Sequence, residues 1–360
     1  MTDLDPFVDR QKPAVPAGAG EAVLSLRDLR VQFPTDEGLV KAVDGVTLDV
    51  YENEVLGIVG ESGSGKSVTT MAVLGLLPKS ARITGEILYR GRNLLDLTER
   101  ELRKLRGEKL AMVFQDALAA LNPVHKVGDQ VGEAIEVHHD LKAGDVRARV
   151  LDLLDLVGIP NPKARIDQYP HEYSGGMRQR AMIAMAIAND PDVLIADEPT
   201  TALDVTIQAQ VLEVLERVQD RTNSAIVLIT HDLGVVAGVA DRVLVMYAGK
   251  PLETGTIDQI FYQPQHPYTL GLLASLPRLD QNADGKRLYR IRGQPPSLIH
   301  VPPGCSFHPR CDYAHVPEPC ATVVPELRSV DELDHTVACH FAETVAGTRP
   351  DDVRPTAAPT

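Results

Sequence analysis

The chain has 360 residues, enough for about two typical domains and a substantial buried core. Hydrophobic residues make up 44% and charged residues 24%, values that exclude a largely disordered or fibrous protein. The net charge of −14 argues against a DNA-binding surface built on a basic face.

The first stretch of the chain, Met1 to Gly20, carries three prolines among small and charged residues and lacks the apolar centre of a secretion signal. We expect disordered tails at 1–20 and 346–360, which are rich in residues that do not build a core. No run of about 18 apolar residues occurs, so the sequence predicts a cytosolic chain that spans no membrane.

Strand-like and helix-like runs alternate from residue 23 onward. Short β-type runs at 23–26, 46–50 and 55–59 come first, and helical stretches and further strands follow. This alternation predicts an α/β domain with a largely parallel sheet. A helix-rich stretch at 127–188 includes 146–157, whose apolar residues have helical spacing.

Three compact apolar runs, at 193–196, 225–229 and 242–246, are candidates for strands covered on both faces. Ligands bind at the carboxyl ends of parallel strands, so the functional residues are expected just after such runs.

The motif G-x-x-x-x-G-K-[ST] follows the apolar run that ends at Val59 and precedes a helix-like segment at 68–77. Its glycines let backbone N–H groups surround phosphates, Lys66 reaches the terminal phosphates, and the Ser67 hydroxyl is a ligand for Mg²⁺. The motif therefore predicts a nucleotide site with these residues: Gly60, Glu61, Ser62, Gly63, Ser64, Gly65, Lys66 and Ser67.

Two carboxylates follow the apolar run 193–196. Asp197 is the candidate second contact to Mg²⁺, and Glu198 is the candidate general base that polarises the attacking water. An acidic pair can also simply end a strand, but the upstream phosphate loop favours the hydrolytic interpretation.

The segment Ser174-Gly175-Gly176-Met177-Arg178-Gln179 resembles the signature motif of the ATP-binding cassette (ABC) ATPases, and it lies upstream of Asp197-Glu198 as in that family. A serine and two glycines at a helix start provide a second anion site, although Ser174 would also serve as an ordinary helix cap. The resemblance implies that Ser174, Gly175, Gly176, Gln179 and Asp204 contact the ATP held by another subunit.

Other positions resemble small motifs of the same family. Gln115 is similar to the lid glutamine that senses Mg²⁺ and water, Leu203-Asp204 to the D-loop, and His231 to the switch histidine that contacts the γ-phosphate. Phe33 matches the aromatic residue that stacks on adenine. Each of these residues alone is more often structural, and it is their order and spacing that favour the family.

The resemblance implies an ABC fold over 21–265, with a RecA-like core, an antiparallel β subdomain and a helical subdomain at about 116–188. It also implies a head-to-tail dimer with two ATP molecules at the interface, so the chain needs a second cassette.

After residue 265 the composition shifts toward Pro, His and Cys. His266-Pro267-Tyr268-Thr269 and two later segments around 304–311 and 335–340 resemble the C-terminal extension of the ATPase subunits of bacterial oligopeptide, dipeptide and nickel importers, here 266–345. This implies two membrane permeases, an external substrate-binding protein, a paralogous partner ATPase and a peripheral place on the cytoplasmic face of the membrane. The permeases are expected to dock near 115–130.

All four cysteines lie in this extension: Cys305, Cys311, Cys320 and Cys339. Four thiolates suit a [4Fe–4S] cluster or a zinc ion by count, although their spacing follows neither usual pattern. The resemblance favours the cluster; the alternatives are zinc, with His308 or His340 replacing a thiol, and unligated thiols.

Three other functions stay open. A nickel or other small-solute importer has the same subunit type. A soluble ABC ATPase acting on nucleic acid is less compatible with the acidic chain, which is expected to bind no nucleic acid. A regulatory module with an idle nucleotide site is disfavoured by Glu198 and His231.

Overall fold

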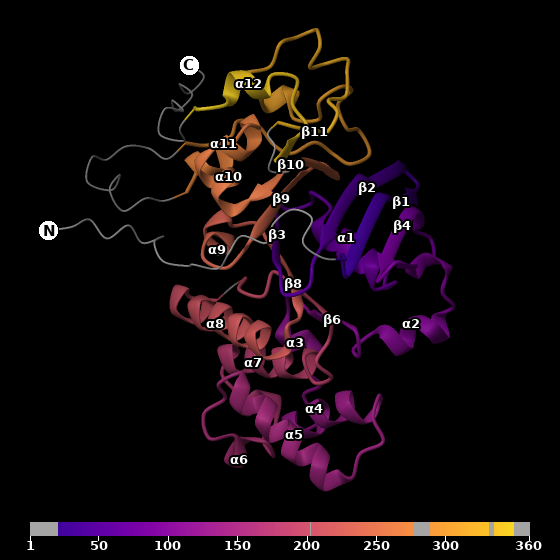
Figure 1. Cartoon of the computed structure of the whole chain (residues 1–360), viewed down its shortest axis with the longest axis vertical. Coiled ribbons are helices and arrows are strands. Elements are labelled where there is room, and N and C mark those ends of the chain that lie inside the picture. The colour runs from indigo at the N-terminus through magenta and orange to yellow at the C-terminus, as the bar shows by residue number, and fades with distance from the viewer. Residues whose placement is uncertain (1–20, 202, 277–288, 331–334, 349–360) are drawn as a thin grey trace, which may run out of the picture.

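The computed structural model describes residues 21–201, 203–276, 289–330 and 335–348. The first expected tail, 1–20, and residues 349–360 of the second lie outside them. The described elements form two sheets, a group of helices, and a C-terminal module, by which we mean residues 289–330 and 335–348 (Figure 1).

The smaller sheet is antiparallel, with strand order β2-β1-β4-β5. Its strands are β1 (Leu24–Thr35), β2 (Gly38–Val50), β4 (Arg82–Tyr89) and β5 (Arg92–Asn93). The β1–β2 hairpin is much longer than the runs 23–26 and 46–50. Leu29, Val31 and Phe33 continue the apolar alternation of β1, and their side chains pack against the core between the two sheets.

The larger sheet has the order β11-β12-β10-β9-β3-β8-β7-β6. Its strands are β3 (Val55–Val59), β6 (Leu110–Val113), β7 (Val193–Asp197), β8 (Ala225–Thr230), β9 (Arg242–Tyr247), β10 (Lys250–Thr256), β11 (Arg328–Ser329) and β12 (Thr336–Val337). Strands β6, β7, β8, β3 and β9 run parallel. The expected parallel sheet is confirmed. Strands β7, β8 and β9 match the three compact apolar runs, and all their residues are buried except the partly buried Arg242.

Helices pack against both sheets. They are α1 (Lys66–Val73), α2 (Glu99–Leu105), α8 (Val205–Thr222), α9 (Leu233–Ala237), α10 (Ile257–Tyr262) and α11 (Pro267–Ala274), with a short 3-10 turn η1 (Leu94–Asp96). Helix α1 ends before the expected 77 because Gly75 adopts a left-handed backbone conformation with φ +60°.

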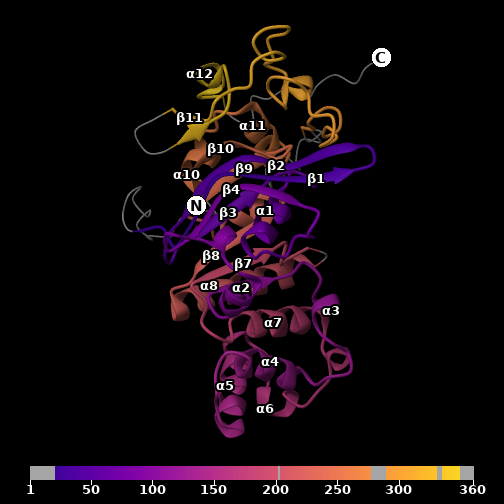
Figure 2. The ribbon, with the colours of Figure 1, turned by 90° about the vertical axis from the view of Figure 1, so that its right-hand side faces the viewer.

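A second group of helices lies at the end of the molecule opposite the C-terminal module (Figures 1 and 2). It consists of α3 (Ala117–Ala120), α4 (Val127–Glu136), α5 (Ala143–Leu156), α6 (Pro162–Arg165), η2 (Pro170–Glu172) and α7 (Gly175–Ala186). Helix α5 begins slightly before the expected 146, and Val150, Leu153 and Leu154 are buried on its inner face. No helix among the described residues is long and apolar enough to span a bilayer.

The C-terminal module contains the 3-10 turn η4 (His308–Arg310), α12 (Ala342–Val345) and the short strands β11 and β12. Strand β12 pairs with β10 through Glu253 and Val337, so the module extends the larger sheet. His335 Nε2 and Glu253 Oε1 lie 2.8 Å apart with both side chains fully buried. Glu253 also accepts the N–H groups of Gln265 and His266, which ties the module and the start of α11 to the core.

Candidate active site

The loop between β3 and α1 requires glycine at three positions for two different reasons. A Cβ on Gly60 would lie 2.1 Å from the Met246 carbonyl oxygen, and one on Gly65 would lie 2.3 Å from that of Ala42. Gly63 has open space around its Cβ position but a φ of +78°, which side chains rarely adopt. The strand therefore turns tightly into α1, and Ser62 and Gly63 are the exposed residues of the loop.

Lys66 is the first residue of α1 and is 4% exposed. Its Nζ donates to the carbonyl oxygens of Gly60, at 2.7 Å, and Glu61, at 3.0 Å. Burial lowers the pKa of Lys66, while nearby Glu198 and Asp197 oppose that shift. The ammonium is thus held across its own loop, close to the two carboxylates.

Ser67 and Asp197 are in direct contact. The Ser67 hydroxyl donates to Asp197 Oδ1 at 2.9 Å, across 130 residues of sequence. Asp197 ends β7 and is 5% exposed, and burial raises its pKa above the usual value. Hydroxyl and carboxylate oxygens are ligands that Mg²⁺ prefers, so this donor pair fits the expected metal.

Glu198 has a φ of +45°, and its N–H donates to the Ile229 carbonyl oxygen on β8. Its Oε2 accepts from Gln115 Nε2 at 3.0 Å and from the Thr201 hydroxyl at 2.8 Å. His231 Nδ1 lies 3.5 Å from Oε1. Three segments therefore direct one carboxylate, as a general base requires.

The structure thus brings six predicted site residues together at the carboxyl edge of the parallel strands: Lys66, Ser67, Gln115, Asp197, Glu198 and His231. Thr201 was missed by the sequence analysis. Its only signal was a hydroxyl three residues after the candidate base. Phe33 lies on β1 opposite Val40, partly buried against the core between the sheets, and its contact with adenine stays a prediction.

The signature segment begins α7, and Ser174 caps the helix by accepting the Met177 N–H at 3.3 Å. Ser174 and Gly175 are exposed, whereas Gly176 is buried against Ile207 of α8. The exposed Asp204 caps α8 in the same way.

Gln179, expected beside Ser174 and Gly175, is 4% exposed, and its Nε2 has no hydrogen-bond partner within the described part of the chain. Ser174, Gly175 and Asp204 therefore present the accessible face, and the contacts of this set with a second subunit's ATP stay predictions.

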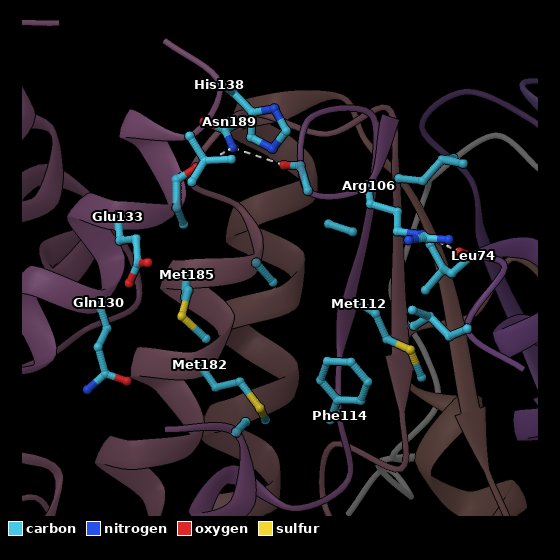
Figure 3. Close-up of a pocket in the computed structure, with 18 residues that line it drawn as sticks. Leu74, Arg106, Met112, Phe114, Gln130, Glu133, His138, Met182, Met185 and Asn189 are labelled. Carbon is cyan, nitrogen blue, oxygen red and sulfur yellow. Dashed lines mark hydrogen bonds between the residues drawn. The ribbon is translucent and has the colours of Figure 1, made fainter. Parts of the chain in front are cut away.

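A groove of about 500 Å³ lies between the larger sheet and the helical group (Figure 3). Met112 and Phe114 line one side and Met182 and Met185 the other, with Glu133 and other polar side chains at the margin. Phe114 is 42% exposed and immediately precedes Gln115, so the groove adjoins a residue that contacts the candidate base.

The four cysteines are free thiols. Burial raises the pKa of Cys311 to about 12 and that of Cys339 to about 11, and neighbouring cysteines add to both shifts. Among the described residues, no group of three or more His, Cys, Asp or Glu side chains is arranged to hold a metal ion. The expected [4Fe–4S] cluster and its zinc alternative are therefore not supported, because clustering in sequence did not bring the ligands into a metal-binding arrangement.

Most of the chain is similar to known ABC transporter proteins. A family model described as ABC transporter matches residues 43–201, and one described as oligopeptide/dipeptide transporter, C-terminal region, matches 252–320. The dipeptide transport ATP-binding protein DppD of Bacillus subtilis (strain 168) is 54% identical over 321 residues, covering 89% of this chain and 94% of the relative. The oligopeptide transport ATP-binding protein OppD of Escherichia coli (strain K12) is 49% identical over 305 residues, covering 85% and 89%.

Among solved structures, a dimeric bacterial ABC transporter cassette superposes with a TM-score of 0.59 and 26% identity. The superposition covers 65% of this chain and 98% of that cassette. The shared fold is therefore that of a complete cassette, and about a third of this chain lies beyond it.

Proposed function

Since the chain belongs to the ATP-binding proteins of dipeptide and oligopeptide ABC transporters, we propose that it hydrolyses ATP to energise import of di- or oligopeptides through partner permeases. The observation that carries the proposal is the meeting of the phosphate loop with Asp197 and Glu198 at one edge of the sheet. A nickel or other small-solute importer would use the same site, and the names of the relatives favour peptides.

Each residue has a distinct role in the proposed reaction. The loop N–H groups and Lys66 would bind the β- and γ-phosphates, and Ser67 and Asp197 would hold Mg²⁺. The metal would neutralise charge that develops on the phosphate oxygens. Glu198 accepts a proton from the attacking water, whose oxygen bonds to γ-phosphorus as the bond from γ-phosphorus to the bridging oxygen breaks, and ADP and inorganic phosphate leave.

Three further side chains position this reaction. Gln115 and Thr201 orient Glu198 by donating to its Oε2. His231 lies beside the other carboxylate oxygen, Oε1, and would contact the γ-phosphate from there. Phe33 supports the adenine.

Two cassettes are needed for one complete site. The exposed Ser174 and Gly175 begin α7, and the exposed Asp204 caps α8; these residues would complete a site whose phosphate loop belongs to the partner. We propose a paralogous ATPase as that partner, with two permeases and an external binding protein in the full transporter, no nucleic-acid partner, and a peripheral position on the cytoplasmic face of the membrane.

The domain division 21–265 and 266–345, with a helical subdomain at about 116–188, is part of this proposal. Its support is that the helical group gathers at one end of the molecule, opposite the C-terminal module (Figure 1). The two units are nevertheless joined, because β12 pairs with β10.

The groove beside Phe114 is our proposed permease-docking surface. An exposed aromatic ring and three methionines provide an adaptable apolar surface of the kind that receives a partner helix. Phe114→Asp should abolish co-purification with the permeases, while Tyr262→Asp, at an exposed ring on α10, should not. Equal recovery of both variants would contradict this placement.

The metal expectation for the cysteines is retained only as a proposal with its own test. Its support is that the thiols of Cys311 and Cys339 interact electrostatically with those of Cys305 and Cys320. Anaerobic purification followed by iron, sulfide and zinc analysis decides it. About four irons per chain would establish the cluster, one zinc would establish the alternative, and neither would leave four packed thiols.

The central test of ATP hydrolysis is Glu198→Gln in the reconstituted transporter, measured by phosphate release and peptide uptake. We expect turnover to fall roughly 100- to 1,000-fold, the contribution of a positioned base, while the full chain still binds ATP. Glu213→Gln, at an exposed position on α8, is the matched control and should retain wild-type turnover. Wild-type turnover in Glu198→Gln would remove this residue from the mechanism.

A further inference from the structure

The second residue of the phosphate loop is held by residues far along the chain. Both Glu61 carboxylate oxygens accept from the Arg310 guanidinium, Oε2 from Nη1 at 2.5 Å and Oε1 from Nη2 at 2.9 Å. The Glu61 N–H donates to the Tyr268 hydroxyl at 2.9 Å. Arg310 lies in the C-terminal module, 249 residues from Glu61, and Tyr268 lies on α11.

Arg310 is also held by residues other than Glu61. It is 5% exposed, its Nε donates to the Arg292 carbonyl oxygen at 2.8 Å, and its Nη1 also reaches the Tyr247 hydroxyl at 3.3 Å. The guanidinium also lies 5.7 Å from the Tyr247 ring centre and 6.0 Å from that of Phe307. A partly buried, bidentate pair of this kind has strong directional preference, so it sets where Glu61 lies.

The position of Glu61 bears on Lys66. The carbonyl oxygens of Gly60 and Glu61 hold the Lys66 ammonium, so fixing Glu61 fixes two of the groups around the phosphate-binding lysine. The Glu61 carboxylate would also stand beside a polyphosphate. Without a cation it would repel that ligand, because like charges in a partly buried site interact strongly.

We propose that Arg310 and Tyr268 are positioning residues of the nucleotide site, which act through Glu61. Arg310 neutralises the carboxylate beside the bound phosphates, and Tyr268 holds the backbone of the loop. This inference rests on the proposed ATP-binding function of the loop, and it assigns the C-terminal module a direct part in ATP affinity.

The module can present Arg310 only when it is folded. Arg310 ends η4, which lies between Cys305 and Cys311, and the Cys305 N–H donates to the Cys320 carbonyl oxygen at 2.9 Å. Damage to this thiol-rich segment should therefore weaken ATP binding, because Arg310 would no longer be held against Glu61 of the phosphate loop.

The first experiment uses Arg310→Gln in the full chain and in the reconstituted transporter. We expect the Kd and KM for ATP to rise about tenfold, which corresponds to about 1.4 kcal/mol, with kcat within about twofold of wild type. The matched control is Arg328→Gln, which removes an ion pair to Glu343 inside the same module, and it should leave both constants unchanged.

The double variant Glu61→Gln/Arg310→Gln separates positioning from simple attachment of the module. Because it removes the repelling carboxylate, it should bind ATP more tightly than Arg310→Gln alone. A pair that only attaches the module predicts lower thermal stability in both variants and no change in ATP affinity for the folded chain. Equal affinity of Arg310→Gln and wild type, or no recovery in the double variant, would overturn the inference.

Tyr268→Phe is a second test of the positioning role, and it can be used if Arg310→Gln does not fold. Loss of one hydroxyl should raise the Kd for ATP about three- to tenfold. Tyr289→Phe, whose hydroxyl contacts Asp312 within the module, should leave it unchanged. An unchanged Kd in Tyr268→Phe would overturn its role. If the wild-type chain itself failed to bind ATP, the proposed function would be refuted, whereas binding by wild type and all variants alike would refute only the positioning role.

Discussion

Replacing Gly175 by alanine should separate the stability of α7 from its function. A Cβ at Gly175 meets no atom within 4 Å, whereas one at the adjacent Gly176 would lie 2.8 Å from Cγ2 of Ile207. Both residues are in the first turn of the same helix, so the two variants differ mainly in the space that the new methyl group occupies.

The two variants should change the thermal midpoint in opposite directions. Alanine improves helix propensity by at most about 1 kcal/mol relative to glycine, so Gly175→Ala should leave the thermal midpoint of the nucleotide-free chain unchanged or slightly raised. Gly176→Ala gains the same propensity but forces Ile207 aside, and overpacking of this kind costs about 1 to 3 kcal/mol. At roughly 2 to 4 °C per kcal/mol, its net midpoint should fall by up to about 8 °C.

Gly175→Ala should lose ATPase turnover although it does not lose stability. In the assembled transporter Gly175→Ala should lower ATPase turnover at least tenfold, because the methyl group fills the exposed surface where the partner's γ-phosphate would approach. Calorimetry of the chain and phosphate release by the complex measure the two quantities. The reasoning is refuted if Gly175→Ala is the less stable variant, or if it turns over ATP at the wild-type rate.

Three other changes test the site and its support. Since the Lys66 pKa is lowered by burial from 10.5, the folded chain binds that proton less tightly than the unfolded chain, and the stability of wild type relative to Lys66→Met should rise as pH increases toward 10.5. Denaturant unfolding across that range measures it, and a falling difference would contradict the sign. Glu253→Ala removes the acceptor of buried donors and should lower the free energy of unfolding by about 3 to 5 kcal/mol in the same assay. The control Glu343→Ala, at an ion pair on the surface, should lower it by less than about 1 kcal/mol, and equal losses would contradict the buried network. Thr201→Val removes one of the two side-chain donors to Glu198 Oε2 and leaves Gln115 as the other, so kcat should fall several-fold at constant KM in steady-state ATPase kinetics. A change in KM alone would argue against an orienting role.

Much of the active site could be predicted from the sequence because its residues occupy positions with local rules. Lys66 and Ser67 belong to a strand, loop and helix motif, and Asp197 and Glu198 follow a buried strand. Parallel strands bring their carboxyl ends to one edge, so the contact between Ser67 and Asp197 across 130 residues follows from the topology.

The remaining contacts depend on tertiary packing that no local pattern encodes. Arg310 lies in a segment with weak periodicity, and nothing near it in sequence indicates that its guanidinium would reach Glu61. The number and grouping of the cysteines predicted a metal site, but metal binding requires a particular arrangement of side chains, which grouping in sequence does not specify.

The pairing of Glu61 with Arg310 also has a consequence for synthesis of the chain. A ribosome adds about 5 to 20 residues per second, so the 249 residues between them take roughly 10 to 50 s to appear. During that interval every residue of the phosphate loop already exists, but the carboxylate within it has no cation. A nascent chain is therefore expected to have low affinity for cellular ATP until its last part emerges, and a chain released early would carry a complete set of ATPase motifs around an impaired loop.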